Sequence, residues 1–337
     1  MADSPLERLS SVADSIQPNE RPLLVVVVGP TAVGKTRWAI DMARALETEI
    51  INADSRQVFK RMAIGTAAPS ANERAEIQHH FVDFIEPDRR YSAGQFEQDA
   101  SVWLDHWFKH RRTAVLAGGS GLYVKALIEG LDDIPADPSI RAQLNQRWEL
   151  HGLAPLIEEL AQLDPAHLSK MDAQNPQRVI RALEVCLISG RPFSSFHKLA
   201  PRARPYDTWV VGLQMDRDSL NSRINMRVEH MIEAGLEAEV RELAHLKDAN
   251  ALRTVGYREW WPFFENECSL TDVQAQIQLR TRQFAKRQMT WFQKMEGVQW
   301  FNASDRENIA EGLRVECEKR SWHLAHPIPH SEPHRDE

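Results

Sequence analysis

One short segment near the start of the chain limits its fold more than any other. Six aliphatic residues, LLVVVV at 23–28, lead directly into Gly29-Pro30-Thr31-Ala32-Val33-Gly34-Lys35-Thr36, and a helical pattern follows over 36–46. The loop fits G-x-x-x-x-G-K-[ST] at every fixed position, and a phosphate-binding loop has this same strand before it and helix after it. The segment therefore predicts an α/β fold built on a P-loop-type parallel sheet.

The loop also predicts a ligand class. Its glycines let backbone N–H groups surround phosphate oxygens, and the following helix adds the partial positive charge of its N-terminus. Lys35 supplies a further charge, and the Thr36 hydroxyl is placed to ligate Mg²⁺. A nucleotide hydrolase normally ends a hydrophobic strand with a metal-holding Asp, whereas the best candidate strand, TAVLAGG at 113–119, ends in glycines. The motif thus indicates a diphosphate-like anion with Mg²⁺ and does not require a nucleotide.

The remaining sequence predicts one core and one insertion. Further strands are expected at 49–55, 79–86, 113–119 and 206–216, and long amphipathic helices at 218–243 and 271–294. Between them, residues 136–200 show helical periodicity and no strand pattern. We expect a P-loop α/β core from 23–135 and 201–322 with C-terminal helices, a helical insertion domain at 136–200, a flexible leader at 1–22 and a disordered tail at 323–337.

Cysteine content and hydrophobicity exclude several protein classes. The three cysteines, Cys186, Cys268 and Cys317, lie far apart, which rules out a disulfide framework and a cysteine zinc site. The longest aliphatic run has six residues, far fewer than the roughly 20 that cross a bilayer, and the first 22 residues offer no apolar signal peptide. We expect a cytoplasmic protein without membrane contact.

Asp54 is the candidate general base. It follows the expected strand at 49–55 near its carboxyl end, and in a parallel sheet this edge is also where the phosphate loop lies. The residues alone leave two interpretations open, because an Asp in this position is also a common helix cap or indirect metal partner. Its neighbours Ser55, Arg56 and Gln57 can hold a polar substrate.

Several other segments suggest RNA as a partner. The turn GGSGLY at 118–123 contains Ser120 and allows close approach of a ligand, although a tight turn alone would also explain it. Basic residues gather at 177–181, at 253–258 and in the helix near 280–294, which has no acidic residue although the net charge is −7. Each cluster alone is typical of a solvated helix face, but together with nearby aromatic residues they favour RNA binding.

Taken together, these motifs resemble the tRNA dimethylallyltransferase (tRNA isopentenyltransferase) family, bacterial type. The resemblance runs from about residue 23 to about residue 300. The matching segments are GPTAVGKT (29–36), NADSRQVFKRMAIGTAAP (52–69), YSAGQF (91–96), GGSGLYVKALIEGL (118–131), NPQRVIRALEV (175–185), RVEHMIEAGLEAEV (227–240), VGYRE (255–259) and TRQFAKRQMTWF (281–292).

The resemblance implies transfer of a dimethylallyl group from dimethylallyl diphosphate to N6 of the adenosine 3′ of the tRNA anticodon, position 37, with release of diphosphate. It implies that Asp54 is the base, that Thr31 lies near the reacting groups, and that Arg227, or else Arg223, contacts the diphosphate. The implied contacts with the anticodon stem-loop are Asp54, Ser55, Arg56, Gln57, Ser120, Arg141, Gln177, Arg178, Val179, Ile180, Arg181, Arg253, Thr254, Val255, Gly256, Tyr257, Arg258, Arg280, Arg282, Lys286 and Arg287. We expect a monomer.

Two other functions are compatible with parts of the sequence. An ATP-dependent small-molecule kinase would use the same P-loop fold, but it would leave the basic segments unexplained. An RNA-binding module that only senses a nucleotide would not need Asp54.

Overall fold

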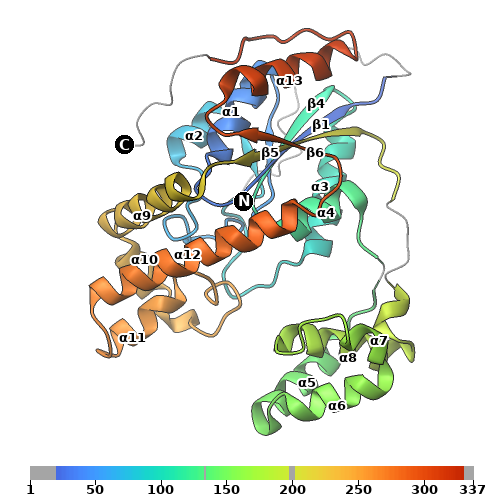
Figure 1. The fold of residues 1–337 in the computed structure, drawn as a ribbon, viewed down its shortest axis with the longest axis vertical. Helices are drawn as coiled ribbons and strands as arrows, with labels where there is room; N and C mark the ends of the chain where they lie inside the picture. Colours follow the sequence, from blue (N-terminus) through green and yellow to red (C-terminus); the bar gives the residue numbers. More distant parts are fainter. Residues whose placement is uncertain (1–19, 133, 197–201, 330–337) are drawn as a thin grey trace, which may run out of the picture. The chain divides into compact units, whose positions relative to one another are not determined.

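The computed structural model describes residues 20–132, 134–196 and 202–329. The chain forms two compact units, one from residues 1–128 and 204–337 and the other from 129–203 (Figure 1). Most of the predicted leader, residues 1–19, and the last part of the predicted tail, residues 330–337, lie outside the described residues.

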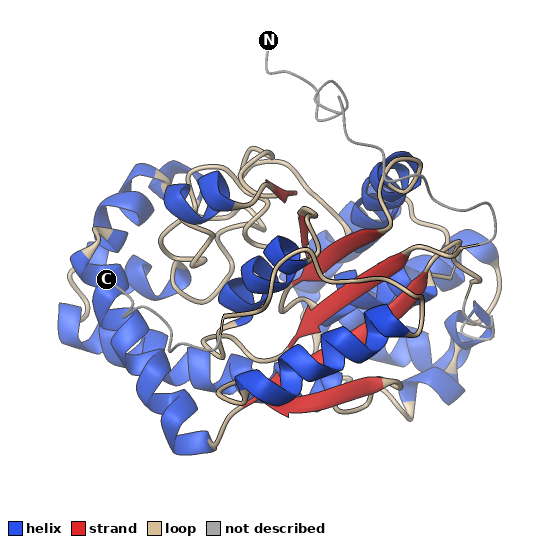
Figure 2. Cartoon of the chain, turned by 90° about the horizontal axis from the view of Figure 1, so that it is seen from above, coloured by secondary structure: helices blue, strands red, loops and turns tan. Residues whose placement is uncertain are grey.

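A parallel six-stranded sheet forms the centre of the first unit (Figure 2). Its order is β3-β2-β4-β1-β5-β6, and every strand pairs in parallel with its neighbours. The strands are β1 (Leu23–Val28), β2 (Ile50–Asn52), β3 (His79–His80), β4 (Thr113–Ala117), β5 (Asp207–Gln214) and β6 (Val298–Asn302). The prediction of a P-loop-type parallel sheet is confirmed.

Both faces of the sheet are buried, which explains why β1 is aliphatic throughout. Leu24, Val26 and Val28 face one core, and the alternate residues of β1 face the other. Helices α3 (Ala93–Trp107), α4 (Gly121–Glu129) and α12 (Leu270–Phe292) pack in the first core. Helices α1 (Lys35–Ala45) and α13 (Arg306–Glu318) pack in the second.

Four further helices complete this unit: α2 (Ala71–Glu76), α9 (Arg217–Glu233), α10 (Leu236–Glu242) and α11 (Trp261–Phe264). The single helix predicted over 218–243 is in fact two helices, α9 and α10. The break falls at Gly235, whose φ of 96° lies in the left-handed region that favours glycine.

The second unit is helical in its described residues, with α5 (Pro138–His151), α6 (Ala154–Leu163), α7 (Pro165–Leu168) and α8 (Pro176–Ser189). Leu144, Leu156, Leu160 and Leu183 belong to a core of its own. The carboxylate of Glu184 is buried within this unit.

Hydrogen bonds and an ion pair link the segments where the chain leaves and re-enters the first unit. Arg204 donates a hydrogen bond to the carbonyl oxygen of Ala126 (2.6 Å) and pairs with Glu97 (2.7 Å). Within the second unit, the N–H of Arg202 donates to the carbonyl oxygen of Glu129 (2.7 Å). The outgoing and returning segments are therefore adjacent.

Three further details differ from the sequence predictions. Strand β3 has only two residues, because the chain turns at Phe81 and Asp83, whose φ angles are positive. Strand β6 was not predicted. The predicted disordered tail includes ordered residues: Ile328 is buried, and the N–H of Ala325 donates to the carbonyl oxygen of Ala45 (3.0 Å). Within the described ranges, every helix is too short or too polar to cross a bilayer.

Candidate active site

A cavity of about 1560 Å³ lies at the carboxyl ends of β1, β2 and β4. Since β4 lies between β1 and β2, the phosphate loop after β1 and Asp54 after β2 flank the glycines that follow β4. The predicted site residues that line the cavity are Thr31, Ala32, Gly34, Lys35, Thr36, Asp54, Ser55, Arg56, Gln57, Ser120, Arg227, Arg253, Thr254, Val255, Gly256, Arg258 and Arg287.

The phosphate loop folds as the motif predicts. Gly34 has a φ of 102° and precedes the first residue of α1, Lys35, whose ammonium donates to the carbonyl oxygen of Pro30 (2.8 Å). Burial lowers the pKa of Lys35 to about 8; the negative charge of Asp54 opposes this shift, and the positive charge of Arg227 adds to it. The ammonium is thus held in a poorly hydrated place, where an anion would be a strong partner.

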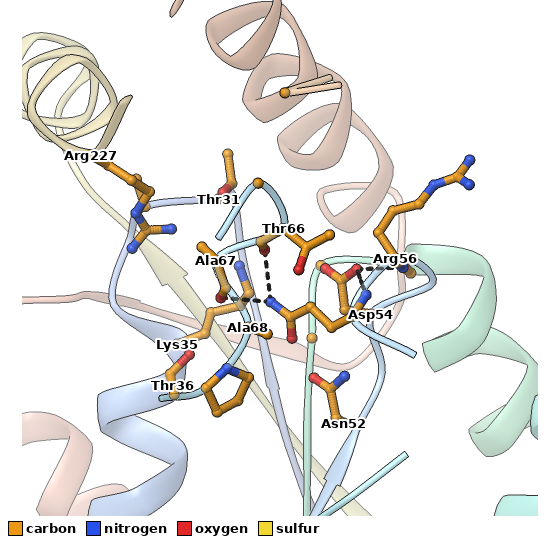
Figure 3. Close-up of a pocket in the computed structure, with 18 of the residues that line it drawn as sticks. Thr31, Lys35, Thr36, Asn52, Asp54, Arg56, Thr66, Ala67, Ala68 and Arg227 are labelled. Carbon is orange, nitrogen blue, oxygen red and sulfur yellow. Dashed lines mark hydrogen bonds between the residues drawn. The ribbon is translucent and has the colours of Figure 1, made fainter. Parts of the chain in front are cut away.

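Asp54 holds its own turn and faces the cavity. Its Oδ1 accepts hydrogen bonds from the backbone N–H groups of Arg56 (2.9 Å) and Gln57 (3.4 Å). No hydrogen bond within the described part of the chain occupies Oδ2. Figure 3 shows Thr31, Lys35 and Arg227 on one side of the cavity and Asp54 on the other. One oxygen therefore caps the turn and the other has no hydrogen bond within the described residues, so a cap and a general base both stay compatible with this geometry.

The turn after β4 packs directly against the Asp54 turn. Ser120 accepts a hydrogen bond from the N–H of Ser55 (2.8 Å), and its hydroxyl donates to Oγ of Ser55 (3.1 Å). A Cβ on Gly118 would overlap the carbonyl oxygen of Ala53. Glycine at 118 is required by this close approach, and Ser120 is fixed beside Asp54.

The side chains of Arg56 and Gln57, next to Asp54, donate hydrogen bonds to backbone carbonyl oxygens of other segments. The Gln57 amide donates to the carbonyl oxygens of Thr66 (3.0 Å) and Ala67 (2.9 Å), which line the cavity (Figure 3). Arg56 donates to the carbonyl oxygen of Asn250 (2.7 Å), and burial lowers the pKa of its guanidinium. These bonds tie three segments of chain together around the carboxylate.

Two arginines of α9 line the cavity one helical turn apart. Arg227 points toward the phosphate loop in Figure 3. Arg223 lies on the same side, with its guanidinium 3.9 Å from the position of a Cβ on Gly34. Both stay candidates for contact with the anion.

Helix α12 contributes an exposed aromatic and basic edge. Phe284, Arg287 and Trp291 line the cavity, and the guanidinium of Arg287 lies 5.8 Å from the Phe284 ring centroid. Trp291 is 42 % exposed, although its indole packs so closely on Gly121 that a Cβ there would overlap it. An exposed aromatic ring beside Ser120 suits an unpaired base.

Sequence reasoning missed Gln288. This α12 side chain is buried, accepts a hydrogen bond from the N–H of Thr31 (2.8 Å) and donates one to the carbonyl oxygen of Gly119 (2.9 Å). The segment TRQFAKRQMTWF contains it, but nothing in that pattern distinguishes it from the other glutamines of the helix.

Three residues predicted to contact RNA have buried side chains in this structure. Tyr257 is fully buried, with its ring against Gly65 and its hydroxyl donating to Glu239 (2.6 Å). Val179 and Ile180 belong to the core of the second unit. Hydrophobic side chains in a basic motif are the ones that hold the helix or turn in place, which is why they face inward.

Other predicted contacts are held by protein partners. Arg141 and Arg181 both pair with the buried Glu184, so the charge of each guanidinium already has a partner within the second unit. Arg258 (3.1 Å) and Arg280 (3.4 Å) pair with the buried Glu259.

The remaining predicted contacts differ in exposure. Arg282 donates to Asn225 of α9 (2.7 Å). Gln177, Arg178 and Lys286 are exposed. Their contact with RNA stays a prediction.

Comparison with known proteins agrees with this geometry. The family model described as IPP transferase matches residues 57–295. The tRNA dimethylallyltransferase of Christiangramia forsetii is 48 % identical over 279 residues, covering 82 % of this chain and 92 % of that protein. The chain belongs to this family.

Solved structures of the family share the fold. The tRNA isopentenylpyrophosphate transferase of Bacillus halodurans is 33 % identical, with a TM-score of 0.64, over 89 % of this chain and 99 % of that one. A eukaryotic dimethylallyltransferase acting on tRNA is 22 % identical, with a TM-score of 0.75, over 91 % of this chain and 82 % of that one.

Proposed function

We propose that this family member transfers a dimethylallyl group from dimethylallyl diphosphate to N6 of the adenosine 3′ of the tRNA anticodon and releases diphosphate. One observation carries the proposal: a single cavity has a phosphate loop on one side and an available carboxylate oxygen on the other. The names of the relatives support the same reaction.

The phosphate loop side binds the leaving group. Lys35, the backbone of the loop and Arg227 hold the diphosphate. The donor set also suits Mg²⁺, which usually keeps several waters and takes one or two protein ligands plus phosphate oxygens. Thr36 lines the cavity and supplies one hydroxyl, and the described residues contain no cluster of three or more acidic, His or Cys ligands. When bound, Mg²⁺ would neutralise charge on the diphosphate.

The Asp54 side handles the nucleophile. The exocyclic amine of adenine is weak, because its lone pair is delocalised into the ring. As N6 bonds to the allylic carbon, the carbon–oxygen bond to diphosphate breaks and Asp54 takes the N6 proton. A positioned base of this kind typically contributes about 10²–10⁴-fold. We expect stabilisation of the leaving group by the loop to be the larger effect.

The target adenosine must leave its stack to enter the cavity. An unpaired anticodon loop allows this more easily than a duplex does. Ser120, Arg253 and the α12 edge of Phe284, Arg287 and Trp291 would hold the flipped nucleoside and its neighbours. One chain supplies all of these groups, so we propose a monomer that acts in the cytoplasm, where tRNA is found.

Label transfer tests the reaction. The protein is mixed with Mg²⁺, radiolabelled dimethylallyl diphosphate and an anticodon stem-loop RNA that carries adenosine 3′ of the anticodon, and ATP replaces the prenyl donor in a parallel arm. Label at that adenosine is the expected result. Consumption of ATP without prenyl incorporation would instead support the kinase.

Asp54→Asn tests the base. The amide keeps an oxygen to accept the N–H of Arg56 but cannot take a proton, so we expect kcat to fall about 10²-fold or more while the Kd for the stem-loop RNA stays unchanged. Normal turnover would remove Asp54 from the mechanism, and RNA binding without any wild-type transfer would support the nucleotide-sensing module.

A further inference from the structure

Gln288 joins the two halves of the cavity. It is separated from Thr31 by 257 residues and from Gly119 by 169, and it hydrogen bonds to the backbone of both. The side chain is 6 % exposed, so water cannot replace these bonds easily. A Cβ on Gly119 would overlap the Gln288 amide nitrogen, which shows how tightly the amide is enclosed.

Only an amide fits these two partners. The oxygen of Gln288 accepts an N–H, while its nitrogen donates to a carbonyl oxygen. A carboxylate would retain the acceptor and place a negative charge against the Gly119 carbonyl. A thioether of similar length would satisfy neither group, and buried backbone groups without partners are strongly disfavoured.

The two partners belong to different turns at the edge of the cavity. Thr31 lies in the loop that holds the diphosphate under the proposed function. Gly119 precedes Ser120, which contacts the turn of the candidate base through Ser55. Backbone hydrogen bonds of the sheet already join β1, β4 and β2, and the Gln288 side chain adds a direct brace between the loop after β1 and the turn after β4.

We propose that Gln288 is a positioning residue that fixes the distance between the allylic carbon and the adenine N6. This inference rests on the proposed function. Displacement of reacting groups by about 1 Å can cost about 10²-fold in rate. The loss of Gln288 therefore slows the chemical step more than it weakens the binding of either substrate.

Gln288→Met is the test variant, and Gln276→Met, on the exposed face of the same helix, is the matched control. Single-turnover transfer is measured with limiting stem-loop RNA, and with the enzyme and dimethylallyl diphosphate both well above the dissociation constants. The rate constant reports positioning, and a thermal melt of each variant reports its folded fraction and stability. We expect a 10- to 100-fold lower rate constant, with the RNA and dimethylallyl diphosphate dissociation constants within about threefold of wild type. Gln276→Met should match wild type.

Gln288→Glu provides a second measurement. It retains the acceptor and most of the side-chain shape but replaces the donor with a charged oxygen that faces the Gly119 carbonyl, so a rate constant as low as that of Gln288→Met would show that the contact with Gly119 is essential. A lower melting temperature with an unchanged rate constant in both variants would show a purely structural role and overturn the inference. Failure of the unsubstituted protein to transfer label would refute the proposed function itself, and this inference with it.

Discussion

The pKa of Lys35 makes binding of the diphosphate depend on pH in a defined range. Burial lowers this pKa to about 8, and the charged groups facing the ammonium are Asp54 and Arg227. The protonated form attracts the anion, so affinity is full below pH 8 and falls as the pH rises through 8. With a pKa near 8, the charged fraction drops from about 0.9 at pH 7 to about 0.1 at pH 9, which corresponds to roughly a tenfold weaker Kd.

Calorimetric titration of the protein with dimethylallyl diphosphate at pH 7, 8 and 9 measures this change directly. Repeating the pH 8 titration in buffers of different ionisation enthalpy gives the proton count, and we expect uptake of about half a proton per ligand at that pH. Lys35→Met is the control, since it binds weakly and should show no change of Kd over the same range.

Two results would refute this reasoning. A wild-type Kd that stays constant from pH 7 to pH 9 would mean that the pKa of Lys35 lies outside this range or that Lys35 does not contact the anion. An equal pH dependence in Lys35→Met would assign the effect to another group.

Three substitutions test other parts of the structure. Gly118→Ala should lower Tm by about 3–10 °C in a thermal melt. The new Cβ overlaps the Ala53 carbonyl, and overpacking costs about 1–3 kcal/mol. An unchanged Tm would contradict the close approach. Trp291→Ala should weaken stem-loop binding by about 5- to 100-fold in a filter or anisotropy assay, because a stacked base is worth about 1–3 kcal/mol. Trp291→Phe should retain most of the affinity. Equal Kd values for wild type and Trp291→Ala would exclude stacking. Tyr257→Phe should lower the free energy of unfolding by about 1–3 kcal/mol, because it removes the hydrogen bond to Glu239. The Kd for RNA should stay unchanged. A large loss of RNA affinity would support Tyr257 as an RNA contact.

The sequence predicts those parts of the site that are local. Residues 29–36 are consecutive, and the strand and helix that flank them fix the loop. The position of Asp54 follows from a topological rule, since the carboxyl ends of parallel strands share one edge. The sequence alone leaves its role open, and the structure explains why: one carboxylate oxygen caps the turn while the other faces the cavity.

The parts that were missed depend on contacts between distant segments. Gln288 gains its role from Thr31 and Gly119, which no local pattern on α12 indicates. Tyr257 shows the opposite case, because its basic neighbours Arg253 and Arg258 are exposed while its own ring is buried, which the basic pattern does not indicate. Strand β6 has no continuous aliphatic run, and its side chains are only partly buried, so its place beside β5 is decided by pairing and not by composition.

The adjacent outgoing and returning segments have a consequence for how this protein can change. Arg204 donates a hydrogen bond to Ala126, and Arg202 donates one to Glu129, so the two ends of the helical segment lie next to each other. A segment with adjacent ends and a core of its own can be lengthened, exchanged or replaced by a short linker at little cost in chain entropy to the sheet that carries it. Residues 129–203 can therefore change in length or sequence while the sheet that carries the candidate site is kept unchanged.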